Sequence, residues 1–254
     1  MRVRMVFAAL LMVAAGVGLA GPAVAAPERP TVTPAMTGND YNGFYVIRQN
    51  YELVYWDKPY GTYQSHLIGP GWQGTRLIAG LSTDQLLQVR DDGTLWDWKK
   101  DYTDNDRWKG YFVGGGWGDV TQITGLGPGS FMALTSGGIL KQYYAPGNQL
   151  NYAQTGYWVS PGGSVKITGR GQGSFFGING TGGAYTYAWN APSWTSTYVG
   201  PGWGNARLLA SVTPFRFVVA RDDGVLVEWN QIGVFGPWQG TTIGGGWNDA
   251  RLLG

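Results

Sequence analysis

The chain of 254 residues has no cysteine and one histidine, His66, and only 13% of its residues are charged. Without cysteine the chain forms no disulfide and carries out no thiol chemistry. A single histidine excludes a metal site built from several histidines. The sequence offers little for catalysis, and we expect a protein that is not an enzyme and needs no cofactor or metal.

An excess of positive charge is also missing. Arg2 and Arg4 lie in a segment that we expect to be removed, and without them the basic residues fall from 18 to 16, equal to the 16 acidic residues. A neutral protein has no electrostatic footprint for nucleic acid or for an anionic membrane surface. We therefore expect neither of these as a partner.

The N-terminus is organised like a secretory signal peptide. A basic start precedes an apolar run from Met5 to Leu19, and Ala23-Val24-Ala25 has the small-x-small form of a cleavage site. A membrane anchor is the alternative, but the run is shorter than a spanning helix. We predict a signal peptide at 1–25, a proline-rich linker at 26–40, and a secreted protein with no membrane insertion after cleavage.

From residue 41 to the end, one sequence motif recurs. It is a glycine-rich junction that usually ends in tryptophan and is followed by a short apolar strand. The copies reach that strand at Ile78, Ile123, Ile167, Leu209 and Leu253. The period of roughly 44 residues lies in the range of propeller blades. One copy, at 159–163, lacks the tryptophan.

Each unit continues with a second strand, a glycine turn and a third strand. The second strands are predicted at 44–47, 86–89, 131–134, 175–178 and 217–220, and the third strands end on Trp56, Trp98, Tyr143, Trp189 and Trp229. Asp91-Asp92-Gly93 and Asp222-Asp223-Gly224 suit hairpin turns better than paired catalytic carboxylates. A variable segment leads to a fourth strand.

These units predict an all-β fold, a five-bladed β-propeller with four antiparallel strands per blade over residues 41–254. A β-trefoil repeats threefold and a β-solenoid has shorter repeats, so both fit less well. The first unit lacks an inner strand, and the chain ends with a spare one at 249–254. We predict that the ring closes by pairing the C-terminal strand into the N-terminal blade, since unpaired edges would otherwise be exposed.

A second aromatic residue precedes each junction tryptophan at a constant spacing. We call these residues the loop aromatics, Tyr63, Trp108, Trp194 and Trp238; the junction tryptophans are Trp72, Trp117, Trp203 and Trp247. The unit without a junction tryptophan has Gln154 at the loop position, so both rings are missing together, which suggests one shared site or contact. Aromatic faces suit the C–H surfaces of sugars, but both rings can also pack blade against blade. We favour packing for the junction tryptophans and sugar contact for the loop aromatics. We expect the ring of Trp108 on the surface, so that Trp108→Ala should leave the melting temperature nearly unchanged.

The segment Asp104-Asn105-Asp106-Arg107-Trp108, together with the Gly-x-Gly-Trp junctions, resembles the repeat of the propeller-type tachylectins, a family of five-bladed lectins. The resemblance covers residues 41–254. It implies that N-acetylated hexosamines such as N-acetylglucosamine bind in clefts between adjacent blades, through the loop that carries this segment. Since the signature stands in one unit here, we expect the strongest of up to four sites at Trp108, with Asp104, Asn105 and Asp106 beside it.

The leading hypothesis is therefore a secreted, multivalent, carbohydrate-binding protein whose partners are glycans. The alternative is a non-catalytic structural or protein-binding propeller at the cell surface. We expect Arg76, Arg207 and Arg251, which recur on the inner strands, to be structural and to reach the central channel or a neighbouring carboxylate.

Overall fold

The computed structural model describes residues 43–146, 149–233 and 236–254. The predicted signal peptide (1–25) and linker (26–40) lie outside these residues. No helix in the described ranges is long and apolar enough to cross a membrane.

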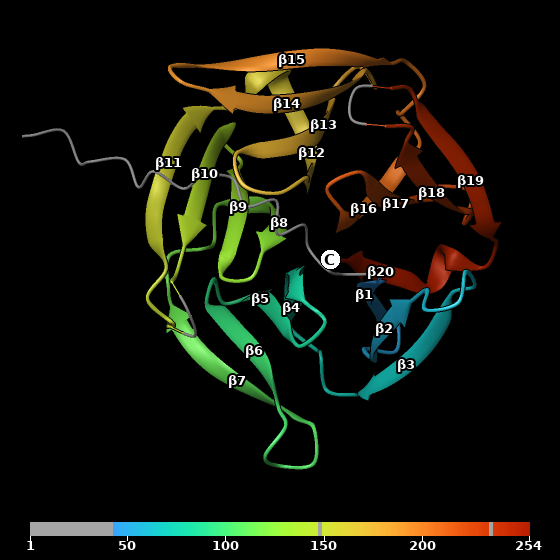
Figure 1. The fold of residues 1–254 in the computed structure, drawn as a ribbon. Coiled ribbons are helices and arrows are strands. Elements are labelled where there is room, and N and C mark those ends of the chain that lie inside the picture. The colour runs from blue at the N-terminus through green and yellow to red at the C-terminus, as the bar shows by residue number, and fades with distance from the viewer. Residues whose placement is uncertain (1–42, 147–148, 234–235) are drawn as a thin grey trace, which may run out of the picture. The chain divides into compact units, whose positions relative to one another are not determined.

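Five antiparallel sheets of four strands each form a ring, as predicted (Figure 1). We number them as blades. Blade 1 holds β20 (Ala250–Leu253), β1 (Gly43–Arg48), β2 (Leu53–Asp57) and β3 (Gln64–Gly69). Blade 2 holds β4 (Thr75–Ser82), β5 (Gln85–Arg90), β6 (Leu95–Asp101) and β7 (Arg107–Gly114), and blade 3 holds β8 (Val120–Gly127), β9 (Ser130–Thr135), β10 (Ile139–Tyr144) and β11 (Ala153–Val159). Blade 4 holds β12 (Ser164–Gly169), β13 (Ser174–Asn179), β14 (Ala184–Asn190) and β15 (Ser193–Gly200), and blade 5 holds β16 (Ala206–Thr213), β17 (Arg216–Arg221), β18 (Leu226–Gln231) and β19 (Trp238–Gly244). Two short 3-10 turns, η1 (Pro161–Gly163) and η2 (Trp247–Asp249), lie at junctions between blades.

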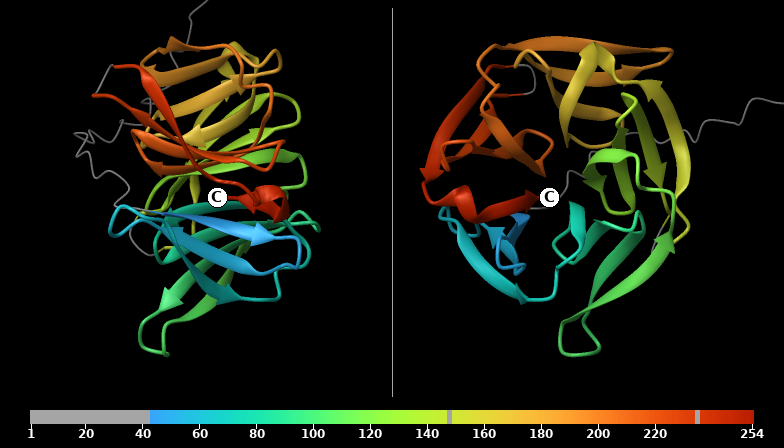
Figure 2. Two further views of the ribbon diagram at one scale, coloured as in Figure 1. Left: turned by 90° about the vertical axis from the view of Figure 1, so that its right-hand side faces the viewer. Right: turned by 180° about the vertical axis from the view of Figure 1, so that it is seen from behind.

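The C-terminal strand closes the ring, which confirms the prediction. β20 pairs antiparallel with β1, with Val46 opposite Leu253, and Figure 2 shows the two strands side by side from behind and from the side. The backbone N–H of Tyr45 donates to the carbonyl of Gly254 at 2.7 Å, and the N–H of Gly254 donates back at 3.0 Å. Both ends of the described chain are thereby held in one sheet.

The turns between second and third strands use glycine where the backbone is left-handed. Gly93 and Gly224 have φ of 74° and 75°, a conformation that costs glycine nothing because it has no Cβ. The aspartates before them belong to the turns: Asp92 accepts a hydrogen bond from the N–H of Thr94, and Asp223 accepts one from the N–H of Val225. The hairpin interpretation of these aspartate pairs therefore agrees with the structure.

The hydrophobic core is divided into five clusters, one between each pair of neighbouring blades. We call these interfaces gap 1–2, gap 2–3, gap 3–4, gap 4–5 and gap 5–1. In gap 1–2, for example, Tyr45 and Ile47 of β1 pack with Ile78 of β4 and Leu86 of β5. Because apolar burial is the main stabilising contribution in folding, the blades depend on one another for stability.

The inner-strand arginines tie three of the blades to the blade that follows. Arg207 donates to the carbonyls of Trp247 and Ala250 at 2.6 Å each, and Arg76 and Arg251 make corresponding bonds to the carbonyls of the blades that follow them. These partners are backbone oxygens, so the expected neighbouring carboxylate was wrong. The structural role holds, because each bond satisfies a carbonyl at a blade junction.

Candidate functional site

The junction tryptophans are buried and pack on the third strand. Trp72, Trp117, Trp203 and Trp247 are 5–9% exposed. Their ring centroids lie 4.9, 5.0, 4.4 and 5.0 Å from those of Trp98, Tyr143, Trp229 and Trp56. Packing, which the sequence favoured for these residues, is what the geometry shows.

In blade 4 the third-strand aromatic residue was misassigned. The strand register places Tyr187 opposite Phe175, as Trp98 lies opposite Leu86 in blade 2. Trp189 lies two residues further along β14 and is not the counterpart of the other third-strand rings. The sequence suggested Trp189 because it is the last aromatic residue before the turn, and only the register distinguishes the two.

The loop aromatics lie deeper than the sequence suggested. Each is half-buried and joins one of the clusters between blades. Trp108, expected on the surface, packs edge-on against Tyr45 of the preceding blade at 5.8 Å. All four residues therefore contribute to packing, whether or not they also touch a ligand.

Blade 3 also has a loop aromatic, Tyr152, which the sequence analysis missed. Gln154 pairs with Tyr143 on β10, and the register of β11 shifts at this point. Tyr152 packs edge-on against Phe131 at 5.2 Å, as Trp194 packs against Phe175 at 5.2 Å. The inference that both rings are lost together was wrong: only the junction tryptophan is missing, and a β-bulge moves the loop ring out of the expected spacing.

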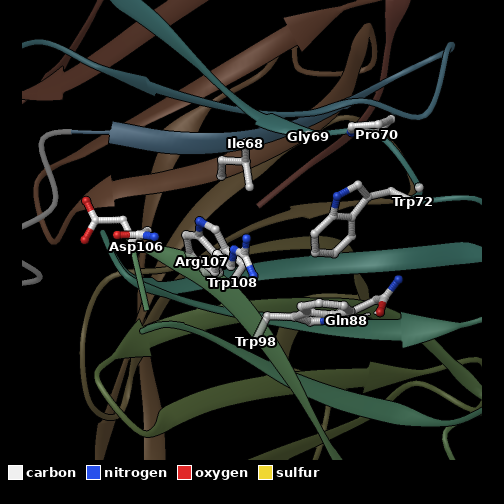
Figure 3. Close-up of a pocket in the computed structure, with 11 residues that line it drawn as sticks. Ile68, Gly69, Pro70, Trp72, Gln88, Trp98, Asp106, Arg107 and Trp108 are labelled. Carbon is white, nitrogen blue, oxygen red and sulfur yellow. Dashed lines mark hydrogen bonds between the residues drawn. The ribbon is translucent and has the colours of Figure 1, made fainter. Parts of the chain in front are cut away.

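Gap 1–2 contains a cleft of about 440 Å³. Figure 3 shows the indole rings of Trp72, Trp98 and Trp108 around it. Its remaining walls come from the junction of blade 1 with blade 2, from β5, and from the connection between β6 and β7; they are Ile68, Gly69, Pro70, Gly71, Gln88, Asn105, Asp106 and Arg107. The site expected to be strongest thus lies at a real cleft with three aromatic walls and a polar rim.

Of the three polar residues predicted beside Trp108, two line the cleft. Asn105 and Asp106 reach it from the turn before β7, where both have left-handed φ angles of 51° and 60°. Asp104 is absent from the lining and instead forms an ion pair with Lys109 at 3.2 Å. Asn and Asp adopt this conformation more readily than other non-glycine residues, so the Asn-Asp pair suits the turn as well as a ligand.

The tip of this hairpin is braced by its own charges. Asp101 accepts hydrogen bonds from the N–H of Thr103 at 2.8 Å and from the ammonium of Lys109 at 2.7 Å. Lys109 and Thr103 hold the pKa of the Asp101 carboxyl well below its usual range. Lys100 forms an ion pair with Asp106 at 3.1 Å. These contacts favour one conformation of the cleft rim, which reduces the entropy lost when a ligand binds.

Three polar or aromatic lining residues were missed: Gln88, Trp98 and Arg107. The side-chain amide oxygen of Gln88 accepts a hydrogen bond from the indole N–H of Trp98 at 2.9 Å, which orients both side chains. A signal for Gln88 was present in the sequence, since the corresponding residues of the other second strands are the small or apolar Val46, Ala133, Gly177 and Val219.

Two other gaps hold a tyrosine against a buried carboxylate. In gap 5–1, Tyr63 donates a short hydrogen bond to Glu228, which is 5% exposed. In gap 2–3, Tyr152 donates to the fully buried Asp97 at 3.0 Å. Burial raises the pKa of both tyrosines, and the hydrogen bond to the carboxylate raises it further. These tyrosines remain protonated donors at neutral pH.

His66 has an acidic neighbour in Asp57. His66 is exposed on β3 and its imidazole lies 3.1 Å from Asp57. Within residues 43–146, 149–233 and 236–254, no group of three histidine, cysteine, aspartate or glutamate side chains is placed to hold a metal ion.

Comparison with known proteins does not assign the chain to a family. No protein-family profile matches the chain, and no curated protein matches it in sequence. Its structure is similar to AofleA from Arthrobotrys oligospora (TM-score 0.45, 13% identity, 81% of this chain and 72% of that one), to U3-55K (0.45, 14%, 74% and 57%) and to human WBSCR16 (0.40, 12%, 67% and 51%). The chain thus spans about half the length of WBSCR16, and likenesses this distant carry no conclusion about function.

Proposed function

We propose that this protein binds carbohydrate and that the ligand lies in the cleft of gap 1–2. The observation that carries the proposal is the set of three indole rings, Trp72, Trp98 and Trp108, around a cleft of about 440 Å³. Cavities of roughly 300–1,000 Å³ lined by aromatic residues with a few placed polar groups are typical of small-ligand sites. We propose a binding protein and not an enzyme, because the acidic side chains at the rim take part in ion pairs and turns.

The chemistry of the walls suits a sugar. An indole face packs against the C–H face of a pyranose, while the carboxamide of Asn105 and the carboxylate of Asp106 can donate to and accept from its hydroxyl groups. The acetamido group of an N-acetylated hexosamine adds one methyl group for an indole face and one amide for hydrogen bonding. N-acetylglucosamine is the favoured ligand. This preference comes from the resemblance to the tachylectins, and the chemistry of the walls is compatible with it.

Titration with free sugar tests the proposal. The protein, produced without residues 1–25, is screened against immobilised glycans that include chitin and then titrated with N-acetylglucosamine by tryptophan fluorescence. A shallow site should bind one monosaccharide at about millimolar to high micromolar strength, roughly −4 to −6 kcal/mol. Trp108→Ala should remove this binding. Tyr60→Ala is the control, because Tyr60 is 89% exposed and absent from the cleft lining.

A second candidate is a protein-binding propeller, and one observation favours it. Leu67, Phe112, Tyr157 and Tyr198, on the outer strands of four blades, are each more than half exposed. Three of the four are aromatic, and aromatic residues are enriched at protein–protein interfaces. If no N-acetylated sugar binds the wild-type protein at several millimolar, this candidate becomes the better account.

Export is part of the proposal, and it rests on the sequence of residues 1–25. N-terminal sequencing of protein recovered from culture medium should show cleavage after Ala25 or Ala26. Intact Met1 in a membrane fraction would contradict it.

A further inference from the structure

The five gaps share one plan but differ in what fills the space next to the loop aromatic. We infer that gap 1–2 is the ligand site of this propeller and that the other four gaps are closed by side chains of the chain itself, so that one protein molecule binds one sugar. This inference rests on the proposed function and changes the valency expected from the repeat.

Gap 2–3 and gap 5–1 are closed by the tyrosine–carboxylate pairs. Asp97 accepts hydrogen bonds from Tyr152 at 3.0 Å and from Gln85 at 3.0 and 3.1 Å. Glu228 accepts from Tyr63 and, at 3.1 Å, from Lys58. A sugar that displaced either tyrosine would leave a buried carboxylate without one of its donors, and this loss opposes binding.

Gap 3–4 is closed by aromatic packing. The ring of Trp194 lies 5.2 Å from Trp158, 5.2 Å from Phe175 and 5.5 Å from Trp189. The place of the missing junction tryptophan is taken as well, because a Cβ atom on Gly162 would meet the hydroxyl of Tyr187. A ligand would have to displace rings that already pack on one another.

Gap 4–5 is closed in a similar way. Trp238 packs on Phe217 at 4.9 Å and on Phe176 at 5.9 Å. The guanidinium of Arg170 lies 5.4 Å from its ring, within the range of a cation–π contact. Arg170 is fixed in turn by the carbonyl of Pro214 at 2.9 Å.

Within the described residues, the loop aromatic of gap 1–2 has no carboxylate partner and no cation–π contact. The residue that corresponds in register to Asp97 and Glu228 is Tyr55, which carries no charge to hold the loop aromatic. The ring of Trp108 has one aromatic neighbour, Tyr45, at 5.8 Å. Next to it lies the cleft, and the β6–β7 hairpin, which extends outward from the ring in Figure 1, supplies the polar rim.

Gln88 is the polar residue of the inner wall in this gap. It is 2% exposed and its position is set by Trp98 and by a hydrogen bond to the hydroxyl of Thr75. Its amide nitrogen and amide oxygen are both used in these contacts, so Gln88 holds the ring of Trp98 in place at the cleft wall, a support that the corresponding apolar or small side chains of the other blades cannot give.

An NMR titration of the thirteen tryptophan indole N–H groups tests the inference. In the intact mature protein, N-acetylglucosamine should shift the indole signals of Trp72, Trp98 and Trp108 with one common dissociation constant, and those of Trp194 and Trp238 should not move. Trp108→Ala should abolish every shift. Trp238→Ala, a matched change in a closed gap, should leave the shifts of Trp72 and Trp98 intact.

Each outcome separates the inference from the proposal beneath it. Shifts at Trp194 or Trp238, or binding that survives Trp108→Ala, would overturn the single-site inference and leave carbohydrate binding in place. Shifts at no tryptophan would overturn the proposed function and the inference with it. Should Trp108→Ala fail to fold, Asn105→Ala serves instead: Asn105 is exposed, and its loss should weaken binding about tenfold, the factor for one net hydrogen bond, without adding sites.

Discussion

Gap 1–2 and gap 2–3 each hold a junction tryptophan packed on a third-strand aromatic residue, with centroids 4.9 Å apart for Trp72 and Trp98 and 5.0 Å apart for Trp117 and Tyr143. They differ in the loop aromatic and in the residue that faces it from the preceding blade. In gap 2–3 the loop aromatic is Tyr152, whose hydroxyl donates to the buried Asp97. In gap 1–2 the loop aromatic is Trp108, and the residue that faces it is Tyr55. The two gaps therefore differ in the loop aromatic and in its facing residue: in one gap the two form a hydrogen bond, and in the other the loop aromatic lies beside a cleft.

The comparison shows how a repeat can keep its fold and change its surface chemistry. Both gaps bury the same kinds of rings, so both stabilise the ring of blades. A tyrosine with a carboxylate partner uses its polar atom inside the protein, whereas an indole beside a cleft keeps a face available to a ligand. Equivalent positions in a repeat thus need not perform equivalent functions.

The largest expected effect comes from removing residues 248–254. This truncation strips β20 from blade 1 and exposes the edge of β1, whose side chains belong to the clusters of gap 5–1 and gap 1–2 and not to that of gap 2–3. We expect loss of the cooperative thermal transition or gross aggregation, together with loss of sugar binding. A truncated protein that melts like the full-length one in calorimetry would show that closure is not required.

Next in size are the two tryptophans of gap 1–2. Trp72→Ala should lower the free energy of unfolding by about 3–5 kcal/mol, because its ring is almost fully buried. Trp108→Ala should cost about 1–2 kcal/mol, since only part of its area is buried. Urea denaturation measures both; equal losses would mean that Trp108 is as much a core residue as Trp72. The near-zero cost expected from a surface position is not retained, because Trp108 packs on Tyr45.

A smaller effect is expected from pH, and it should have opposite signs in the two tyrosine–carboxylate pairs. Burial raises the pKa of Asp97 above its usual 3.8, despite the hydrogen bonds it accepts. Burial acts on Glu228 in the same direction, but the hydrogen bonds from Tyr63, Asn230 and Lys58 outweigh it and lower the pKa below its usual 4.5.

The linkage between protonation and folding gives the signs. Glu228 stabilises the folded state above pH 4.5, and this contribution is lost as the pH falls through its lowered pKa; the contribution of Asp97 is greatest below pH 3.8 and is lost as the pH rises through its raised pKa. In thermal melts between about pH 3 and 6, the advantage of wild type over Glu228→Gln should grow with pH, and that over Asp97→Asn should shrink. Parallel curves for both variants would show that the two pairs titrate alike.

The smallest effect is expected at the rim. Asp104→Ala removes a partly exposed ion pair with Lys109, so stability should change by about 0.5 kcal/mol or less. Sugar affinity should stay the same, because Asp104 does not line the cleft, whereas Asp106→Ala should weaken it. If Asp104→Ala abolished binding, the hairpin tip would have to turn toward the ligand.

Much of the fold was predictable because the repeat is local. The strand pattern, the Asp-Gly turns and the spare strand at the end are each encoded within a few residues, and they yielded five blades and the closing pair β1–β20. The position of the cleft was also predicted, through the segment around Trp108. The counterpart of the loop aromatics in blade 3 was misplaced because the bulge in β11 changes the spacing without changing the strand.

The sequence by itself therefore determined the architecture, since periodicity and turn chemistry depend on near neighbours in the chain. Whether a gap is filled by side chains or contains a cleft was decided by tertiary structure. Asp97 and Tyr152 lie in successive blades, 55 positions apart, whereas Glu228 and Tyr63 are 165 positions apart and meet because blade 5 packs on blade 1. Packing of neighbouring blades brings both pairs together, and it leaves Trp108 without such a partner because the side chain that faces it, Tyr55, is uncharged.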